Sequence, residues 1–126
     1  MRYCDTSFLA PLVREERTSS QVARFLGGLP AGELAISLWT EVEFMSLLAR
    51  DVRMGVIRGD EADEADALFA GMIRQSFQVI LPVVDDYTLA RRYLQNYRTG
   101  LRAGDALHLA IARNHQQTLS TAWIRP

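Results

Sequence analysis

The chain has 126 residues, of which 48% are hydrophobic and 23% charged, and its formal net charge is −1. This length and apolar content fit one domain over residues 1–126 and exclude a disordered chain. No apolar run approaches the ~18 residues of a membrane span, and no secretory signal is visible at residue 1, so we expect a cytoplasmic protein without membrane contact. The single cysteine, Cys4, excludes an internal disulfide.

The charge is made entirely with arginine: all 14 basic residues are arginines and none is lysine. A biased genome composition explains this without any function. Arginine is also the side chain best suited to bidentate contact with phosphate. Because 15 acidic residues oppose the 14 arginines, a nucleic-acid partner requires a local basic patch or a bound cation.

Short apolar runs alternate with segments of helical period along the chain. The runs that we expect to form strands are residues 3–4, 34–38, 77–81 and 119–123. The segments that we expect to form helices are residues 6–13, 18–26, 40–54, 62–73, 85–97 and 105–115.

Three of these helices carry more specific expectations. The clearest has apolar residues at steps of three and four, namely Ala62, Ala65, Phe69, Met72 and Ile73. Asp85 and Asp86 begin a helix with a stripe of Leu89, Tyr93 and Tyr97. We expect both stripes to pack in the core, with a dimer surface as the alternative. Gly100 and Gly104 precede the nearly all-apolar helix that begins at Asp105.

Strands separated by helices imply parallel pairing through right-handed crossovers. Continuous apolar strands agree, because a parallel sheet is covered on both faces. The sequence therefore predicts a three-layer α/β/α domain with a small parallel sheet. Sites in such folds lie beyond the carboxyl ends of the strands.

Three carboxylates occupy such positions. Asp5 ends the first strand, Glu43 lies in the first turn of the helix after the second strand, and Asp105 opens the helix after Gly104. Carboxylates gathered in one crevice repel one another unless a divalent cation lies between them, and oxygen ligands favour Mg²⁺ or Mn²⁺.

Each carboxylate also has a purely structural explanation. Asp5 precedes Thr6 and Ser7 as an N-terminal cap would. Thr40 and Glu43 match a capping box, with Glu43 reaching back to the Thr40 backbone. Asp105 in a first helical turn is favoured by the helix dipole.

Three collinear segments carry a family resemblance. These are Tyr3-Cys4-Asp5-Thr6-Ser7, Ser37-Leu38-Trp39-Thr40-Glu41-Val42-Glu43 followed by Ser46-Leu47-Leu48-Ala49, and Leu101-Arg102-Ala103-Gly104-Asp105-Ala106-Leu107-His108-Leu109-Ala110. They resemble the PIN-domain family, and within it the VapC-like toxins of bacterial toxin–antitoxin pairs. The resemblance runs from residue 1 to about residue 122 and implies a PIN-like α/β/α fold with Asp5, Glu43 and Asp105 as the site carboxylates.

The carboxyl end departs from the family pattern. The family carries a fourth acid after the last strand, in a T-x-D or T-A-D context, whereas here Trp123 follows Thr121 and Ala122. The last strand and terminal helix are thus expected to be truncated or degenerate, with weaker metal binding and reduced activity.

The resemblance implies Mg²⁺- or Mn²⁺-dependent hydrolysis of RNA phosphodiesters. Asp5, Glu43 and Asp105 would hold the ion, and the hydroxyls of Thr6, Ser7 and Thr121 would steady a carboxylate or a water. Arg102 would contact a phosphate, with a solvated surface arginine as the alternative, and His108 is expected to pack between helices. The implied partners are RNA, a cognate antitoxin and a second copy of the chain.

Two other functions stay open. The first is a degenerate PIN domain that binds antitoxin or RNA without cleaving, as Trp123 suggests. The second is another doubly wound fold with a strand-end aspartate, such as a phosphoryl-accepting receiver or a phosphatase. This second function is disfavoured because the chain contains no lysine and no D-x-D spacing after the first strand.

Overall fold

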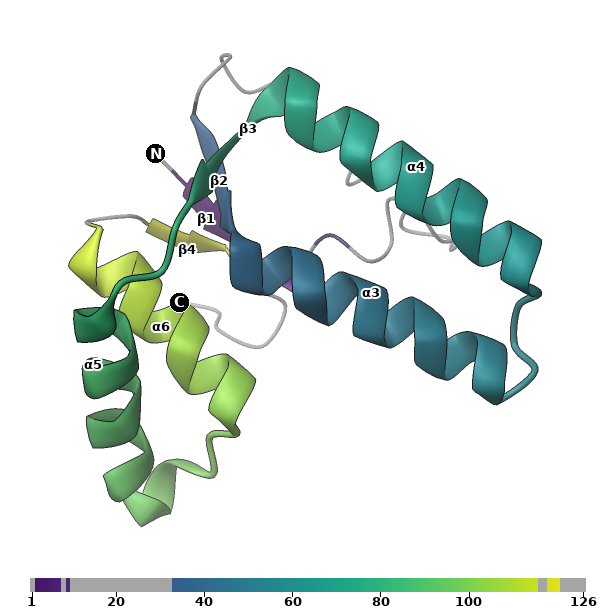
Figure 1. Ribbon diagram of the computed structural model, residues 1–126. Coiled ribbons are helices and arrows are strands. Elements are labelled where there is room, and N and C mark those ends of the chain that lie inside the picture. The colour runs from purple at the N-terminus through teal and green to yellow at the C-terminus, as the bar shows by residue number, and fades with distance from the viewer. Residues whose placement is uncertain (1, 8, 10–32, 116–117, 121–126) are drawn as a thin grey trace.

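The computed structural model describes residues 2–7, 9, 33–115 and 118–120. Within them, four parallel strands form one sheet in the order β3-β2-β1-β4 (Figure 1). The strands are β1 (Arg2–Cys4), β2 (Leu34–Ser37), β3 (Phe77–Ile80) and β4 (Thr118–Ser120). The predicted parallel sheet is confirmed. Strand β4 begins one residue before its predicted start, and residues 121–123 lie outside the described part of the chain.

The sheet is covered on both faces, which explains its continuous apolar strands. Tyr3 and Cys4 are both fully buried but belong to different core clusters, because successive strand residues point to opposite faces. Cys4 packs with Ile36 and Phe44 on one face, and Tyr3 packs with Ala106 and Ile111 on the other.

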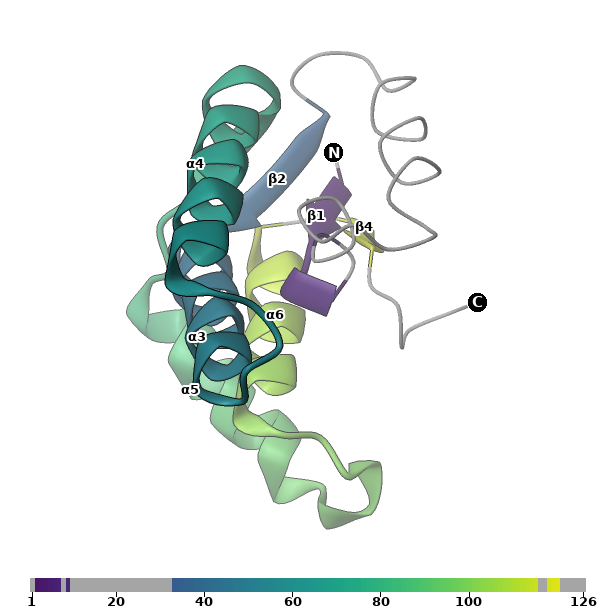
Figure 2. The ribbon, with the colours of Figure 1, turned by 90° about the vertical axis from the view of Figure 1, so that its right-hand side faces the viewer.

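The covering helices are α3 (Leu38–Arg53), α4 (Gly59–Ser76), α5 (Val84–Gln95) and α6 (Ala103–Asn114), with a short 3-10 helix, η1 (Tyr97–Thr99). Figure 1 shows α3 and α4 on one side of the sheet and α5 and α6 on the other. In Figure 2 the pair α3 and α4 lies toward the viewer and α5 lies behind. This is the predicted three-layer arrangement. No helix in the described ranges is long and apolar enough to cross a membrane.

The start of α3 corrects one expectation. The helix begins at Leu38 rather than Thr40, and Ser37 is its N-cap. The Ser37 hydroxyl accepts from the Thr40 backbone N–H at 3.4 Å, and the Thr40 hydroxyl accepts from the Ser37 N–H at 3.2 Å. The predicted capping box of Thr40 and Glu43 is therefore wrong. Because the cap is made three residues earlier, by Ser37, the Glu43 side chain is left to make other contacts.

The predicted apolar stripes fare differently. Ala62, Ala65 and Phe69 of α4 are buried in the core. The stripe on α5 ends at Tyr93, because Asn96 caps the helix and Tyr97 lies in η1 with 90% of its surface exposed. Residues 10–13 and the predicted helix at 18–26 lie outside the described residues.

Candidate functional site

A cleft of about 720 Å³ opens beyond the carboxyl ends of β1 and β2, beside the start of α6. Its lining includes Asp5, Glu43 and Asp105, the three predicted carboxylates. Thr6, Ser7 and Arg102 line it as well. Three segments that are far apart in the sequence thus meet at one edge of the sheet, as parallel strands dictate.

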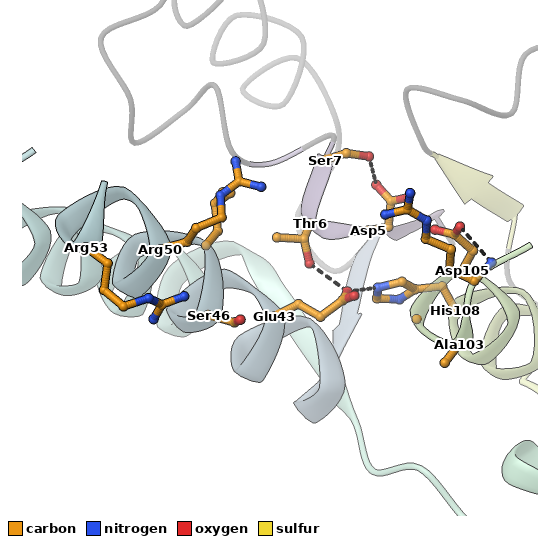
Figure 3. Close-up of a pocket in the computed structure, with 13 residues that line it drawn as sticks. Asp5, Thr6, Ser7, Glu43, Ser46, Arg50, Arg53, Ala103, Asp105 and His108 are labelled. Atoms are coloured by element: carbon orange, nitrogen blue, oxygen red, sulfur yellow. Dashed lines mark hydrogen bonds and ion pairs between the residues drawn. The ribbon is translucent and has the colours of Figure 1, made fainter. Parts of the chain in front are cut away.

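Asp5 is held where β1 ends and helical residues begin. Asp5 is 97% buried, and its carboxylate accepts a hydrogen bond from the Ser7 hydroxyl at 2.9 Å. The neighbouring Thr6 hydroxyl donates to Oε1 of Glu43 at 3.0 Å. The two hydroxyls that follow the strand therefore contact two different carboxylates (Figure 3).

Glu43 belongs to a hydrogen-bonded chain that runs into the core. Its Oε1 also contacts Nε2 of His108, and the His108 Nδ1 lies 2.6 Å from the Tyr3 hydroxyl. The Tyr3 hydroxyl is in turn 2.8 Å from the Ser37 hydroxyl. His108 is buried as expected, but it joins a carboxylate of the cleft to β1, an inner strand of the sheet, rather than only packing between helices.

Burial favours the protonated form of Tyr3 in this chain of contacts. Desolvation raises the pKa of the Tyr3 phenol to about 12, although hydrogen bonds from Ser37 and Thr40 oppose the shift. Tyr3 therefore keeps its proton, and its hydroxyl lies within hydrogen-bond distance of Nδ1 of His108. The other ring nitrogen of His108, Nε2, contacts Oε1 of Glu43.

Asp105 lies in the first turn of α6, which begins two residues before the predicted start. Its Oδ2 accepts from the backbone N–H of Arg102, the N-cap residue, at 3.4 Å. The structural explanation for this residue is thus present in the fold. Asp105 caps its own helix while lining the cleft.

Gly104 permits the close approach of α3 and α6. A Cβ at this position would overlap Oε2 of Glu43 and lie 3.4 Å from its Cδ and 3.6 Å from Nε1 of Trp39. The sequence suggested only that Gly104 marks a helix start. Its absent side chain is what lets the Glu43 carboxylate lie against α6.

The donor set suits a hard divalent cation, because three carboxylates share one cleft with no cysteine among its lining residues. Across the described ranges, however, no group of three His, Cys, Asp or Glu side chains is arranged to hold a metal ion. Glu43 is turned toward Thr6 and His108, and Asp105 toward its own helix cap. Metal binding by all three would require Asp105 to give up its capping bond, while Glu43 would offer Oε2, the oxygen that Thr6 and His108 do not contact. Thr121 and Trp123 lie outside the described residues.

Several lining residues were missed from the sequence. Ser46, Leu47, Arg50 and Arg53 of α3 line the cleft with Glu43. They recur at steps of three and four from Glu43, which places them on one face of a helix. That spacing is visible in the sequence once Glu43 is assigned to the cleft.

A family model described as PIN domain matches residues 2–122. Among curated proteins, no sequence matches significantly. The fold is similar to that of VapC20 from Mycobacterium tuberculosis, described as a sarcin-ricin loop cleaving toxin, with 21% identity, a TM-score of 0.71 and coverage of 93% of this chain and 85% of that one.

Two further structures have similar folds. FitAcB from Neisseria gonorrhoeae matches at 21% identity and a TM-score of 0.68, covering 96% of this chain and 86% of that one. A toxin–antitoxin complex from Klebsiella pneumoniae matches at 22% identity and a TM-score of 0.64, covering 94% and 83% respectively. At these identities the similarity establishes the fold.

Proposed function

The chain belongs to the PIN domain family, and on that basis we propose that it is a divalent-metal-dependent endoribonuclease, the toxin of a VapC-like toxin–antitoxin pair. The observation that carries the proposal is that Asp5, Glu43 and Asp105 come from three separate segments and line one cleft. Fold similarity to a toxin described as cleaving the sarcin-ricin loop supports RNA as the substrate.

Asp5, Glu43 and Asp105 are the residues that would hold Mg²⁺ or Mn²⁺. A bound ion supplies an acidified water and neutralises charge on the phosphate. The chain's own groups orient the ligands: Ser7 holds Asp5 at 2.9 Å, and Thr6 and His108 both hold Oε1 of Glu43. Such contacts lower the cost of assembling the carboxylates around an ion.

Arg102 is the proposed contact for the substrate phosphate nearest the carboxylates. It is exposed, it lines the cleft, and its residue begins α6 as the N-cap. Its guanidinium offers the planar pair of donors that matches phosphate oxygens. Thr121 stays a proposed steadying hydroxyl from the sequence alone.

The proposed partners are an antitoxin that occupies the cleft and a second copy of the chain. A toxin–antitoxin complex among the similar structures supports the first. For the second, Leu38, Val42 and Met45 of α3 expose between 44% and 58% of their surfaces at helical spacing, an apolar stripe of the kind that interfaces cover. The cytoplasmic location belongs to this proposal as well.

Membership of the PIN domain family excludes the receiver or phosphatase alternative, because the family match spans residues 2–122. The second candidate is a PIN domain that binds without cleaving. The observation that favours it is the capping bond of Asp105 to the Arg102 backbone, which competes with metal ligation.

Cleavage of a structured RNA, followed while Mn²⁺ or Mg²⁺ is titrated, tests the proposal. We expect cleavage that EDTA abolishes and that Asp5→Asn reduces by more than the roughly 10–100-fold typical of outer-shell changes. Asp85→Asn, an exposed first-turn aspartate of α5, is the matched control. RNA binding without any metal-dependent cleavage would support the non-cleaving alternative instead.

A further inference from the structure

The cleft that holds three carboxylates also carries three arginines, Arg50, Arg53 and Arg102. Arg102 adjoins Asp105 at the start of α6, whereas Arg50 and Arg53 belong to the last turns of α3. Figure 3 shows Arg50 and Arg53 on the same helix as Glu43, on the side away from Asp105 and His108. The cleft therefore has an acidic end and a basic end.

The helix geometry sets the separation of these two ends. At 1.5 Å per residue, Arg50 and Arg53 lie about 10 Å and 15 Å along the axis of α3 from Glu43. Ser46 and Leu47 fill the same face between them. Arg50 and Arg53, here called the arginine row, thus lie further along α3 than Glu43 while lining the same cleft.

The arginine row is unpaired within the described part of the chain. No ion pair there involves the guanidinium of Arg50 or Arg53, and both residues are exposed. Arg58, just beyond α3, instead pairs with Asp60 at 3.0 Å. Cations in the last turn of a helix also interact favourably with its dipole. The interaction with the helix dipole does not depend on which side of the helix the two arginines occupy. It therefore does not explain why both of them line the cleft.

We propose that the arginine row binds backbone phosphates of an RNA strand beyond the scissile position, so that substrate must extend along α3 to bind well. This inference rests on the proposed function and names the part of the substrate that α3 contacts. A polynucleotide carries a charge at every nucleotide. One phosphate can therefore lie at the carboxylates while others in the same strand reach Arg50 and Arg53.

An acidic protein segment is the other polyanion that could contact the arginine row. RNA is favoured because the row continues the face that carries Glu43, so that one extended strand can follow it. The planar guanidinium also matches two phosphate oxygens. The experiment below separates the two classes.

The binding test uses Asp5→Asn protein in EDTA, so that cleavage does not interfere, and follows the anisotropy of a labelled single-stranded RNA. On this background, Arg50→Gln with Arg53→Gln is compared with Arg91→Gln with Arg92→Gln. The control pair is also exposed, lies on α5 and is not among the residues that line the cleft. We expect the slope of log affinity against log salt to become shallower by about 1.4 in the first pair, at about 0.7 per lost phosphate contact, and to stay unchanged in the control pair.

Equal slopes for the two pairs would overturn the inference. The inference would also be overturned if a polyglutamate peptide of equal charge competed with the RNA, and if Arg50→Gln with Arg53→Gln reduced the affinity for the peptide as much as the affinity for the RNA. Circular dichroism of each protein verifies that the variants are folded.

A cleavage arm separates this inference from the proposed function. In protein with wild-type carboxylates, Arg50→Gln with Arg53→Gln should raise KM for a long RNA and leave kcat unchanged. Shortening the RNA on the side that extends along α3 should abolish this difference in KM. Cleavage with unaltered KM would contradict the binding of RNA by the arginine row and leave the proposed nuclease activity supported. Row-dependent binding without cleavage by the wild type would support the row while contradicting the nuclease.

Discussion

His108 contacts Glu43 through Nε2 across 65 positions of sequence, and its other ring nitrogen lies 2.6 Å from the Tyr3 hydroxyl. A carboxylate of the cleft is thereby connected to β1, one of the two inner strands of the sheet. Because the imidazole is buried and held at both nitrogens, it has little freedom to turn. The orientation of Glu43 therefore depends on a residue that does not itself belong to the acidic set.

Replacing His108 tests this dependence. His108→Leu removes the donor to Glu43 and should lower Mn²⁺ affinity by about 10–100-fold, the usual effect of losing an outer-shell contact. His108→Gln keeps an N–H near the Nε2 position and should recover part of the loss. Calorimetric titration of Mn²⁺ measures both variants.

The other histidine of the chain provides the matched control. His115 contacts Asp86 at 3.2 Å, outside the residues that line the cleft. His115→Leu should leave Mn²⁺ affinity unchanged. Equal affinities of wild type and His108→Leu would show that His108 does not position Glu43.

Gly104→Ala should disturb Glu43 without unfolding the protein. The added Cβ overlaps Oε2 of Glu43, whereas alanine is favoured over glycine in a helix, by about 0.5–1 kcal/mol in the interior and by less at the second residue of α6. We expect weaker Mn²⁺ binding at nearly unchanged thermal stability. Gly71→Ala in α4 is the control, because its Cβ meets only Nη2 of Arg74 at 4.0 Å. That variant should gain stability and keep its Mn²⁺ affinity, and the same outcome for Gly104→Ala would contradict the prediction.

Asp86 should contribute more to stability than its neighbour Asp85. Asp86 is fully buried and accepts from the Val83 backbone at 2.9 Å, from Asn114 at 2.8 Å and from His115 at 3.2 Å. Asp86→Ala leaves these donors unsatisfied and should cost about 3 kcal/mol or more of unfolding free energy. Asp85→Ala, at an exposed position, should cost less than about 1 kcal/mol. Urea denaturation measures both, and equal losses would contradict this account.

The Cys4 thiol should be unreactive in the folded protein. Desolvation raises its pKa from 9.0 to about 12, with a further increase from the nearby Asp5 charge. An alkylating reagent at pH 8 should modify Cys4 in urea but not in native buffer. Modification at equal rates in both would contradict its burial.

The same pKa shift makes stability depend on alkaline pH. Between about pH 9 and pH 12 the unfolded chain releases the thiol proton while the folded chain retains it, so the free energy of unfolding should fall as pH rises. Cys4→Ala should show a shallower fall between pH 8 and pH 10, measured by urea denaturation. Parallel curves for the two proteins would contradict the shift.

The sequence predicted most of the fold because the strands are buried on both faces. Leu34, Ala35 and Ile36 form an uninterrupted apolar run, and they are fully or almost fully buried between two helical layers. The boundaries of strands and helices were harder to predict from the sequence. The run continues into Leu38, so the pattern did not show that Ser37 ends the strand and caps α3. Tyr97 continued the spacing of Leu89 and Tyr93, but α5 ends at Gln95.

The candidate site was predictable only in part. Strand ends and helix starts identified Asp5, Glu43 and Asp105 as residues of one edge. The contacts of His108 with Tyr3 and Glu43 join positions 105 and 65 residues apart, and no local pattern encodes such a pairing. Likewise, the need for glycine at position 104 arises from the approach of another helix, which periodicity does not reveal.

We infer that the carboxylates of Asp5, Glu43 and Asp105 bind one metal ion together. Calorimetric titration of Mn²⁺ into the wild type and into Asp5→Asn, Glu43→Gln and Asp105→Asn tests this inference. We predict one Mn²⁺ per wild-type chain, with affinity lowered at least about tenfold by each of the three substitutions and unchanged by Asp85→Asn. A wild type that binds no Mn²⁺, or an affinity that any of the three substitutions leaves intact, would contradict the claim.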